Sequence, residues 1–281
     1  MHGGATRGRK SFALVLGGGG ARGLAHIPVL EALDELGLRP SVVAGSSIGA
    51  VLGAAYAAGM SGKDIRRIVI RLLHARPEML RVLMAARATT IRDVFSSGFG
   101  NPMVLDGERL LAALLPDIVP QNFENLAVPL VVTATDLWAR TEIRYDAGPL
   151  RPALAATMAV PGLIRPVAID DRVLIDGSAV NPLPFDCVMQ RADVVVAVDV
   201  SVGPREAAGI PDPWETLFAA IQIMGHTIVA EKLKAAAPPV VIRPKVGAFR
   251  LLDFFAVSSI LRAADPVKAE AKEVLAQALA G

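Results

Sequence analysis

The sequence predicts an α/β fold of three layers, in which helices cover both faces of a mostly parallel central sheet. Short runs of apolar and β-branched residues, typical of buried strands, alternate with longer stretches whose apolar residues have helical spacing. Strands that alternate with helices indicate a mostly parallel sheet. Sites in such sheets lie at the carboxyl ends of the strands, and we expect the chemistry of this chain there.

The elements follow from these two patterns and from their end signals. The first helix ends at Gly37, and the third begins with Ser61 and Asp64 in a capping arrangement. The last helix is expected to have Asp265 as its cap and Pro266 at its first position. Strands are predicted at 12–16, 42–44, 128–137 and 192–202. Helices are predicted at 23–36, 48–58, 61–73, 107–115, 213–234 and 266–279.

Composition limits the classes of function. The 281 residues carry a net charge of only +2, which argues against a nucleic-acid binder. Cys187 is the one cysteine, so the fold needs no internal disulfide. No segment has linker composition and no repeat occurs, so we expect a disordered basic tail at 1–11 and a single domain at 12–281.

Two segments raise the question of a membrane. The basic residues before position 11 precede an apolar run too short for a signal peptide, so we expect a cytoplasmic protein. Residues 40–62 carry no charge, and Gly45, Gly49 and Gly53 have the spacing of packed transmembrane helices. Their Gly, Ala and Ser content favours a buried strand, a tight turn and a buried helix, with a membrane span as the open alternative.

Residues 14–33, LVLGGGGARGLAHIPVLEAL, place four glycines before a stretch with helical spacing. Such a loop can bind a dinucleotide, bind a nucleoside triphosphate or hold an oxyanion with bare amides. A dinucleotide site needs an acidic residue at the end of the second strand, where this chain has only glycine and serine. A triphosphate loop needs a Gly-Lys-Ser/Thr sequence, which this region lacks. The oxyanion interpretation remains.

A G-x-S-x-G pattern follows the second predicted strand, with Ser47 between Gly45 and Gly49. A nucleophilic serine on a sharp strand-to-helix turn needs small residues two positions before and after it, because larger side chains would collide. The serine then lies at a helix N-terminus, which favours developing negative charge. Together with the glycine loop after the adjacent strand, this pattern predicts a serine hydrolase.

A serine nucleophile needs a base, and the chain has four histidines. Only His226 follows Ser47 in the Ser, Asp, His order of an α/β-hydrolase, but it falls inside the helix predicted at 213–234. We therefore give His226 mainly a structural role. Asp176 is the better-placed base, because an apolar strand ends at this carboxylate and turn-forming residues follow it.

Five ordered motifs resemble those of the patatin-like phospholipases. They are GGGARG at 18–23, GSSIG at 45–49, ATDL at 134–137, ATMAVPGLIRPV at 156–167 and DGS at 176–178. The resemblance spans roughly residues 12–202 and implies a Ser-Asp dyad on an α/β fold, with Ser47 as nucleophile and Asp176 as base. The oxyanion segment that it implies consists of Gly18, Gly19, Gly20 and Arg22. The chain departs from the family pattern at Thr157, Ile164 and Ser178, which bears on substrate preference more than on activity.

The resemblance implies a lipid acyl-ester hydrolase of the phospholipase A or lysophospholipase type, with no cofactor and no metal. Its expected partner is a lipid or lysophospholipid substrate. A non-catalytic member of the same fold that binds lipid or protein is the alternative, and a nucleotide-binding oxidoreductase is a third hypothesis.

Basic residues are frequent between positions 63 and 92, interleaved with apolar ones. They are Lys63, Arg66, Arg67, Arg71, Arg76, Arg81, Arg87 and Arg92. One interpretation is a solvated helical face, and the other is a basic amphipathic surface that contacts an anionic membrane. The second would place the protein peripherally at the inner membrane surface.

Overall fold

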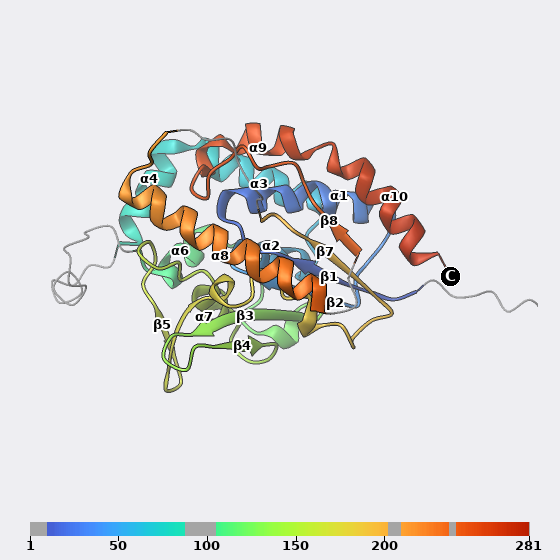
Figure 1. Ribbon diagram of the computed structural model, residues 1–281, viewed down its shortest axis with the longest axis horizontal. Helices are drawn as coiled ribbons and strands as arrows, with labels where there is room; N and C mark the ends of the chain where they lie inside the picture. The colour runs from blue at the N-terminus through green and yellow to red at the C-terminus, as the bar shows by residue number, and fades with distance from the viewer. Residues whose placement is uncertain (1–9, 88–104, 202–208, 236–239, 281) are drawn as a thin grey trace, which may run out of the picture.

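The computed structural model describes residues 10–87, 105–201, 209–235 and 240–280 (Figure 1). The strands form one sheet in the order β5-β6-β3-β2-β1-β7-β8, and β4 pairs with β3 beside this path. The strands are β1 (Phe12–Leu16), β2 (Val42–Ser46), β3 (Leu130–Asp136), β4 (Thr141–Tyr145), β5 (Val167–Ile169), β6 (Arg172–Asp176), β7 (Val194–Val198) and β8 (Val240–Ile242).

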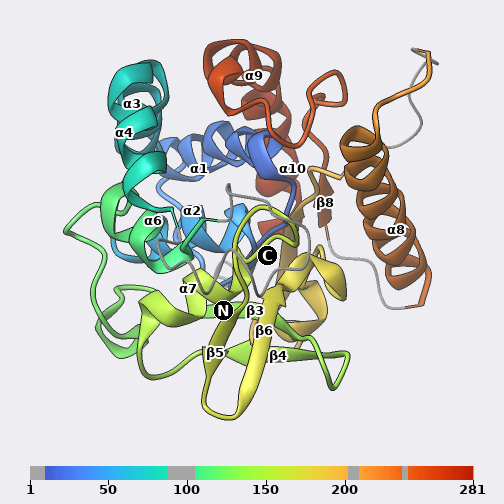
Figure 2. The ribbon, with the colours of Figure 1, turned by 90° about the vertical axis from the view of Figure 1, so that its left-hand side faces the viewer.

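Helices lie on both sides of this sheet (Figure 2). The helices are α1 (His26–Glu35), α2 (Ile48–Ala57), α3 (Gly62–His74), α4 (Arg76–Ala85), α6 (Gly107–Leu114), α7 (Leu150–Thr157), α8 (Pro213–Ala235), α9 (Val257–Ala264) and α10 (Val267–Leu279). A 3-10 helix over Gly20–Ala25 precedes α1. The predicted α/β fold with a central sheet between helices is confirmed.

The centre of the sheet is parallel and one edge is antiparallel. The strands β3, β2, β1, β7 and β8 pair in parallel, as predicted. The strands β4, β5 and β6 join antiparallel at the β3 edge. The sequence did not predict β4, β5 or β8, because these strands are short or partly exposed and their apolar alternation is weak.

Successive side chains of β1 point to opposite faces of the sheet and enter two separate cores. Leu14 and Leu16 pack in the core that includes α1, α2 and α10. Ala13 and Val15 pack in a second core that includes Phe185 and, from α8, Val229. Both faces of the central strand are therefore sealed from water.

The uncharged stretch 40–62 forms β2, a tight turn and α2, and this confirms its interpretation as a buried strand, turn and helix. Two other expectations were wrong in detail. The cap of the last helix is Pro266, because Asp265 ends α9 and its carboxylate binds Arg66 at 2.7 Å. Ser11, expected in the tail, is held by hydrogen bonds to Asp193. The remaining tail, residues 1–9, lies outside the described residues.

Candidate active site

Three strands bring the predicted serine and aspartate together. The β4 strand occupies one edge of β3, so β2 and β6 must share the other edge. Along that edge Ser46 pairs with Thr133, and Asp176 pairs with Ala134, the next residue of β3. The carboxyl end of β2 therefore meets the carboxyl end of β6, and the turn at Ser47 lies against Asp176.

The backbone at Ser47 is strained. Its φ of 53° and ψ of −131° are unfavourable for a residue with a side chain. A Cβ at Gly45 would lie 2.6 Å from the Ala50 nitrogen, and a Cβ at Gly49 would lie 2.2 Å from the Leu16 oxygen. Both positions therefore exclude side chains, which is the physical basis of the G-x-S-x-G spacing in this chain.

The Ser47 hydroxyl donates a hydrogen bond to Asp176 Oδ2 at 2.7 Å. Both side chains are buried, and the Ser178 amide donates to the other carboxylate oxygen at 2.7 Å. Burial raises the pKa of Asp176, and the hydrogen bonds from Ser47 and Ser178 oppose that rise only in part. In this arrangement the Asp176 carboxylate is shielded from water and lies in place to accept the proton of the Ser47 hydroxyl.

Thr157, at the end of α7, supports the turn at Ser47. Its Oγ1 accepts a hydrogen bond from the Ser47 amide at 2.8 Å, and its side chain is fully buried. The sequence identified Thr157 only as a departure from the family pattern. Its contact with Ser47 spans 110 positions and has no local sequence signal.

The glycine loop lies directly beside this pair. A Cβ at Gly18 would lie 2.1 Å from Ser178 Oγ and 3.3 Å from Ser47 Cβ. The Gly18 amide donates to the Pro182 oxygen at 2.9 Å. In the part of the chain that the structure describes, the amides of Gly19 and Gly20 have no hydrogen-bond acceptor. These two amides are the ones available to an added oxygen atom.

Two buried side chains fix the glycine loop from within the fold. Arg22 Nε donates to the Gly19 oxygen at 3.3 Å. His26 Nε2 lies 2.8 Å from the Gly17 oxygen, and a carbonyl only accepts, so this nitrogen carries the proton. Burial lowers the pKa of His26 to about 4, which keeps the ring neutral at physiological pH. No local sequence signal predicts this contact of His26.

His226 lies on α8, as the sequence predicted, and its Nδ1 is 3.4 Å from Ser201 Oγ. The hydroxyl of Ser47 is bonded instead to Asp176. Of the two bases that the sequence offered, the structure brings the aspartate to the serine.

The structure contains an apolar cavity of about 130 Å³. Ile48, the residue after Ser47, forms part of its wall, and so does Leu24 beside the glycine loop. The remaining wall comes mainly from α2, α3 and the segment 114–116. The cavity is apolar and suits a hydrocarbon group, and Ser47 and Asp176 are not among the residues that line it.

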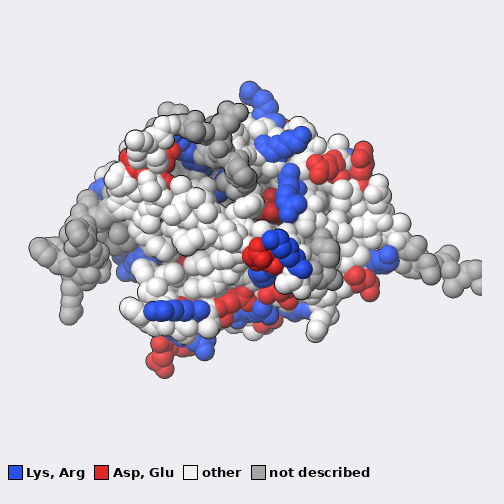
Figure 3. All heavy atoms as spheres, viewed as in Figure 1, with Lys and Arg blue, Asp and Glu red and all other residues white. Residues whose placement is uncertain are grey.

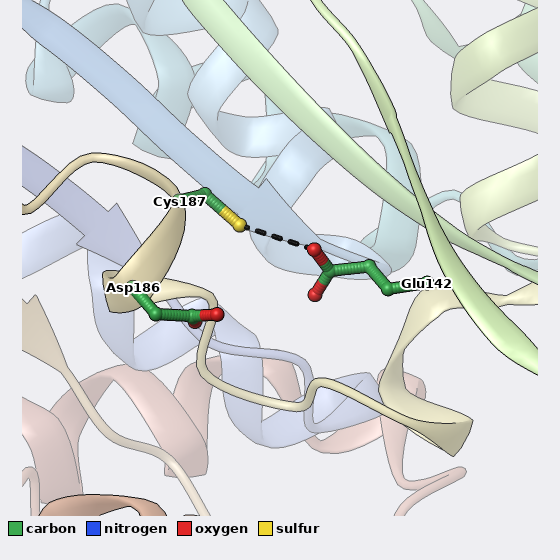
Figure 4. Close-up of side chains that lie close together, drawn as sticks. All are labelled: Glu142, Asp186 and Cys187. Carbon is green, nitrogen blue, oxygen red and sulfur yellow. Dashed lines mark hydrogen bonds between the residues drawn. The ribbon is translucent and has the colours of Figure 1, made fainter.

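A second cluster of chemically active side chains lies elsewhere on the protein (Figure 4). Ligand atoms of Glu142, Asp186 and Cys187 lie within 4.8 Å of one another. Lys232 and Asn181 bind Asp186, while Arg144 and Asn181 bind Glu142. Burial raises the pKa of the Cys187 thiol, so the thiol stays protonated. We interpret this cluster as an ion network that fastens α8 to β4.

The basic stretch is partly used within the fold. Arg66 on α3 binds Glu31 at 2.6 Å and Asp265 at 2.7 Å, and Arg67 binds Asp64 at 2.8 Å. Arg92 lies outside the described residues. The Arg66 contacts join α3 to α1 and to the end of α9, which is a structural role.

A sequence profile of the patatin-like phospholipases matches residues 14–189. The chain belongs to the patatin-like phospholipase family. The resemblance predicted from the five motifs is thereby confirmed, and membership implies a lipid hydrolase.

The patatin-like relatives are larger proteins. An uncharacterized NTE family protein of Mycobacterium tuberculosis is 36% identical over 200 residues, covering 70% of this chain and 51% of that protein. The human patatin-like phospholipase domain-containing protein 6 is 30% identical over 193 residues, covering 68% of this chain and 13% of that protein. This chain therefore spans about half the length of the mycobacterial relative.

Among solved structures, VipD from Legionella pneumophila matches with a TM-score of 0.52 at 15% identity. The match covers 96% of this chain and 67% of VipD. It supports a shared patatin-like fold.

Proposed function

We propose that this protein hydrolyses acyl esters of lipids, with Ser47 as the nucleophile and Asp176 as its base. The observation that carries the proposal is the buried 2.7 Å hydrogen bond from the Ser47 hydroxyl to Asp176 on a strained turn. Strain of this kind is retained at functional sites, since the surrounding structure must maintain it against its cost.

In the first half of the reaction, Ser47 Oγ attacks the ester carbonyl carbon while its proton moves to Asp176. The carbonyl oxygen becomes an oxyanion. When the intermediate collapses, the ester bond breaks and Asp176 returns the proton to the departing alkoxide. In the second half, Asp176 takes a proton from water as the water oxygen attacks the acyl-serine. The bond between Ser47 Oγ and the acyl carbon then breaks, Asp176 returns the proton to Ser47 Oγ, and the carboxylic acid leaves.

The glycine loop supplies the oxyanion donors in this proposal. Of the predicted segment, the Gly19 and Gly20 amides carry this role, because the Gly18 amide is engaged by Pro182. Gly18 leaves room beside Ser47, and Arg22 supports the Gly19 carbonyl. One such donor contributes about 3 kcal/mol of transition-state stabilisation.

The substrate in this proposal is a phospholipid or lysophospholipid. The apolar cavity beside Ile48 supports a long acyl group, and family membership supports a lipid. In the described part of the chain, every helix is too short or too polar to cross a bilayer. In this proposal the protein reaches its substrate by peripheral contact with the cytoplasmic face of a membrane.

A fluorophosphonate probe tests this function. We expect the probe to label Ser47 alone, and Ser47→Ala to lose both labelling and ester hydrolysis while remaining folded. Ser46→Ala is the matched control, because Ser46 is the adjacent buried serine and its hydroxyl is bonded to Ser178. Labelling elsewhere, or full turnover in Ser47→Ala, would contradict the assignment. A wild-type protein that neither labels nor hydrolyses esters would favour the non-catalytic alternative.

A further inference from the structure

The α8 helix is long, apolar and weakly buried. Of its 23 residues only Phe218 and Val229 are buried. Leu217 and Met224 lie seven residues apart, so they share another face, and they are 45% and 57% exposed. Trp214, in the first turn, is 54% exposed and stacks on Phe218. This outer face of α8 leaves large apolar side chains in contact with water.

The first turn of α8 lies at the rim of the candidate site, between two loops that border it. The Trp214 ring packs against Gly162, in the loop that follows α7. Glu215 binds Arg250 at 3.3 Å on the opposite side. The next residue, Leu251, accepts a hydrogen bond from the Ala21 amide of the glycine loop at 2.8 Å. The first turn of α8 therefore contacts the loop after α7 and the segment 250–251, and the latter is bonded to the glycine loop.

The surface over α8 is mostly uncharged, with Asp and Glu side chains near its first turn and Lys and Arg side chains at its margin (Figure 3). Between residues 213 and 230 the only charged residue is Glu215, and Arg250 neutralises it. Exposed Lys245 and Arg250 belong to the segment that joins β8 to α9. An apolar face with cations beside it is complementary to a bilayer whose headgroups are anionic.

We propose that the outer face of α8 docks the protein onto an anionic phospholipid bilayer, with Trp214 at the headgroup level. The inference rests on the proposed function, because a lipid hydrolase needs a bilayer at the mouth of its site. Trp and Met side chains on this face enter the bilayer boundary, and Lys245 meets lipid phosphates. The helix lies in the interface and does not cross it.

The rival docking face is the basic stretch with α4. Leu80 and Met84 on α4 are 58% and 57% exposed, close to the values of Leu217 and Met224. The basic stretch is less suited to lipid phosphates, since Arg66 and Arg67 already bind carboxylates. The two helices thus offer a matched pair of surfaces, each with one exposed leucine and one exposed methionine.

Vesicle binding by the full chain tests the proposal. Binding is measured by co-sedimentation with vesicles of equal parts phosphatidylcholine and phosphatidylglycerol, in a Ser47→Ala background that leaves the lipid intact. We expect Leu217→Gln and Met224→Gln each to weaken binding about tenfold, and Leu80→Gln with Met84→Gln to have little effect. The reverse order, or tight binding by the α8 double variant, would overturn the proposal. So would an α8-dependent dimer that binds no vesicles, which sedimentation velocity would reveal.

Tryptophan emission provides a second measurement. The chain has two tryptophans, so Trp138→Phe leaves Trp214 as the only reporter. We expect its emission to shift to shorter wavelength when the same vesicles are added, and an unchanged spectrum would contradict docking through α8. Hydrolysis of a water-soluble short-chain ester is measured separately. Vesicle binding without ester hydrolysis would defeat the proposed function alone, and hydrolysis without vesicle binding would defeat the docking proposal alone.

Discussion

Replacing Asp176 by asparagine tests the proposed base with little change in shape. An asparagine side chain can still accept the hydrogen bond from the Ser178 amide with its oxygen. Its NH₂ group then faces Ser47 Oγ, where the carboxylate oxygen accepted a proton at 2.7 Å. Ser47 keeps its position and loses its proton acceptor.

We expect Asp176→Asn to lower kcat by about 10²- to 10⁴-fold, or about 3 to 5 kcal/mol of transition-state stabilisation. The KM for a short-chain ester should change little, because the substrate-binding surfaces remain. In the wild type, kcat should fall at acidic pH with an apparent pKa above that of an ordinary aspartate, since burial raises the pKa of Asp176.

The same substitution has a predicted effect on stability. Because the pKa of Asp176 is higher in the folded protein than in the unfolded chain, its ionisation destabilises the fold. The contribution of Asp176 to wild-type stability should decrease as the pH rises from about 4 through the raised pKa, and the asparagine variant lacks this contribution. Asp176→Asn should therefore have the higher Tm at neutral pH, and the difference should vanish below about pH 4.

His226→Gln is the matched comparison in both assays. Its kcat on the same ester should stay within about threefold of wild type, because His226 is bonded to Ser201 and not to Ser47. Circular dichroism checks that each variant is folded. A folded His226→Gln protein without activity, beside an active Asp176→Asn protein, would refute the assignment of the base.

Three further predictions concern the support of the site. Gly49→Ala should lower the free energy of unfolding, measured by urea titration, by about 1 to 3 kcal/mol, because the new Cβ would lie 2.2 Å from the Leu16 oxygen. Gly53→Ala in the same helix is the control and should lower it less, because its Cβ would lie 3.1 Å from a Val43 methyl group. Thr157→Val should cost about 1 to 3 kcal/mol by leaving the buried Ser47 amide without an acceptor, and an undiminished stability, or no recovery in Thr157→Ser, would contradict this. The pKa of His26 is about 4 in the folded protein and about 6.5 in the unfolded chain, so between these pH values the unfolded chain binds a proton that the buried ring does not. The contribution of His26 to the free energy of unfolding should therefore fall by about 3 kcal/mol as the pH decreases from 6.5 to 4. His26→Gln should remove this part of the pH dependence, as measured by denaturation curves at each pH.

The sequence by itself determined the features that depend on near neighbours. The spacing of Gly45, Ser47 and Gly49 predicted the sharp turn, because a Cβ at Gly45 would collide with the Ala50 backbone of the same turn. Apolar periodicity likewise predicted the buried parallel strands and most of the helices, since burial on one face imposes a regular pattern. These short-range constraints act on consecutive residues and leave a signal in the sequence.

Only the tertiary structure decided which distant residues meet. The strand β2 pairs with the first part of one edge of β3, and β6 pairs with the rest of the same edge, so Asp176 reaches Ser47. No local sequence pattern encodes that pairing. The same is true of the Thr157 contact with the Ser47 amide and of the Arg66 contacts that use part of the basic stretch within the fold. The physical reason is that hydrogen bonds and ion pairs between distant segments depend on strand register and helix packing, which the whole chain sets together.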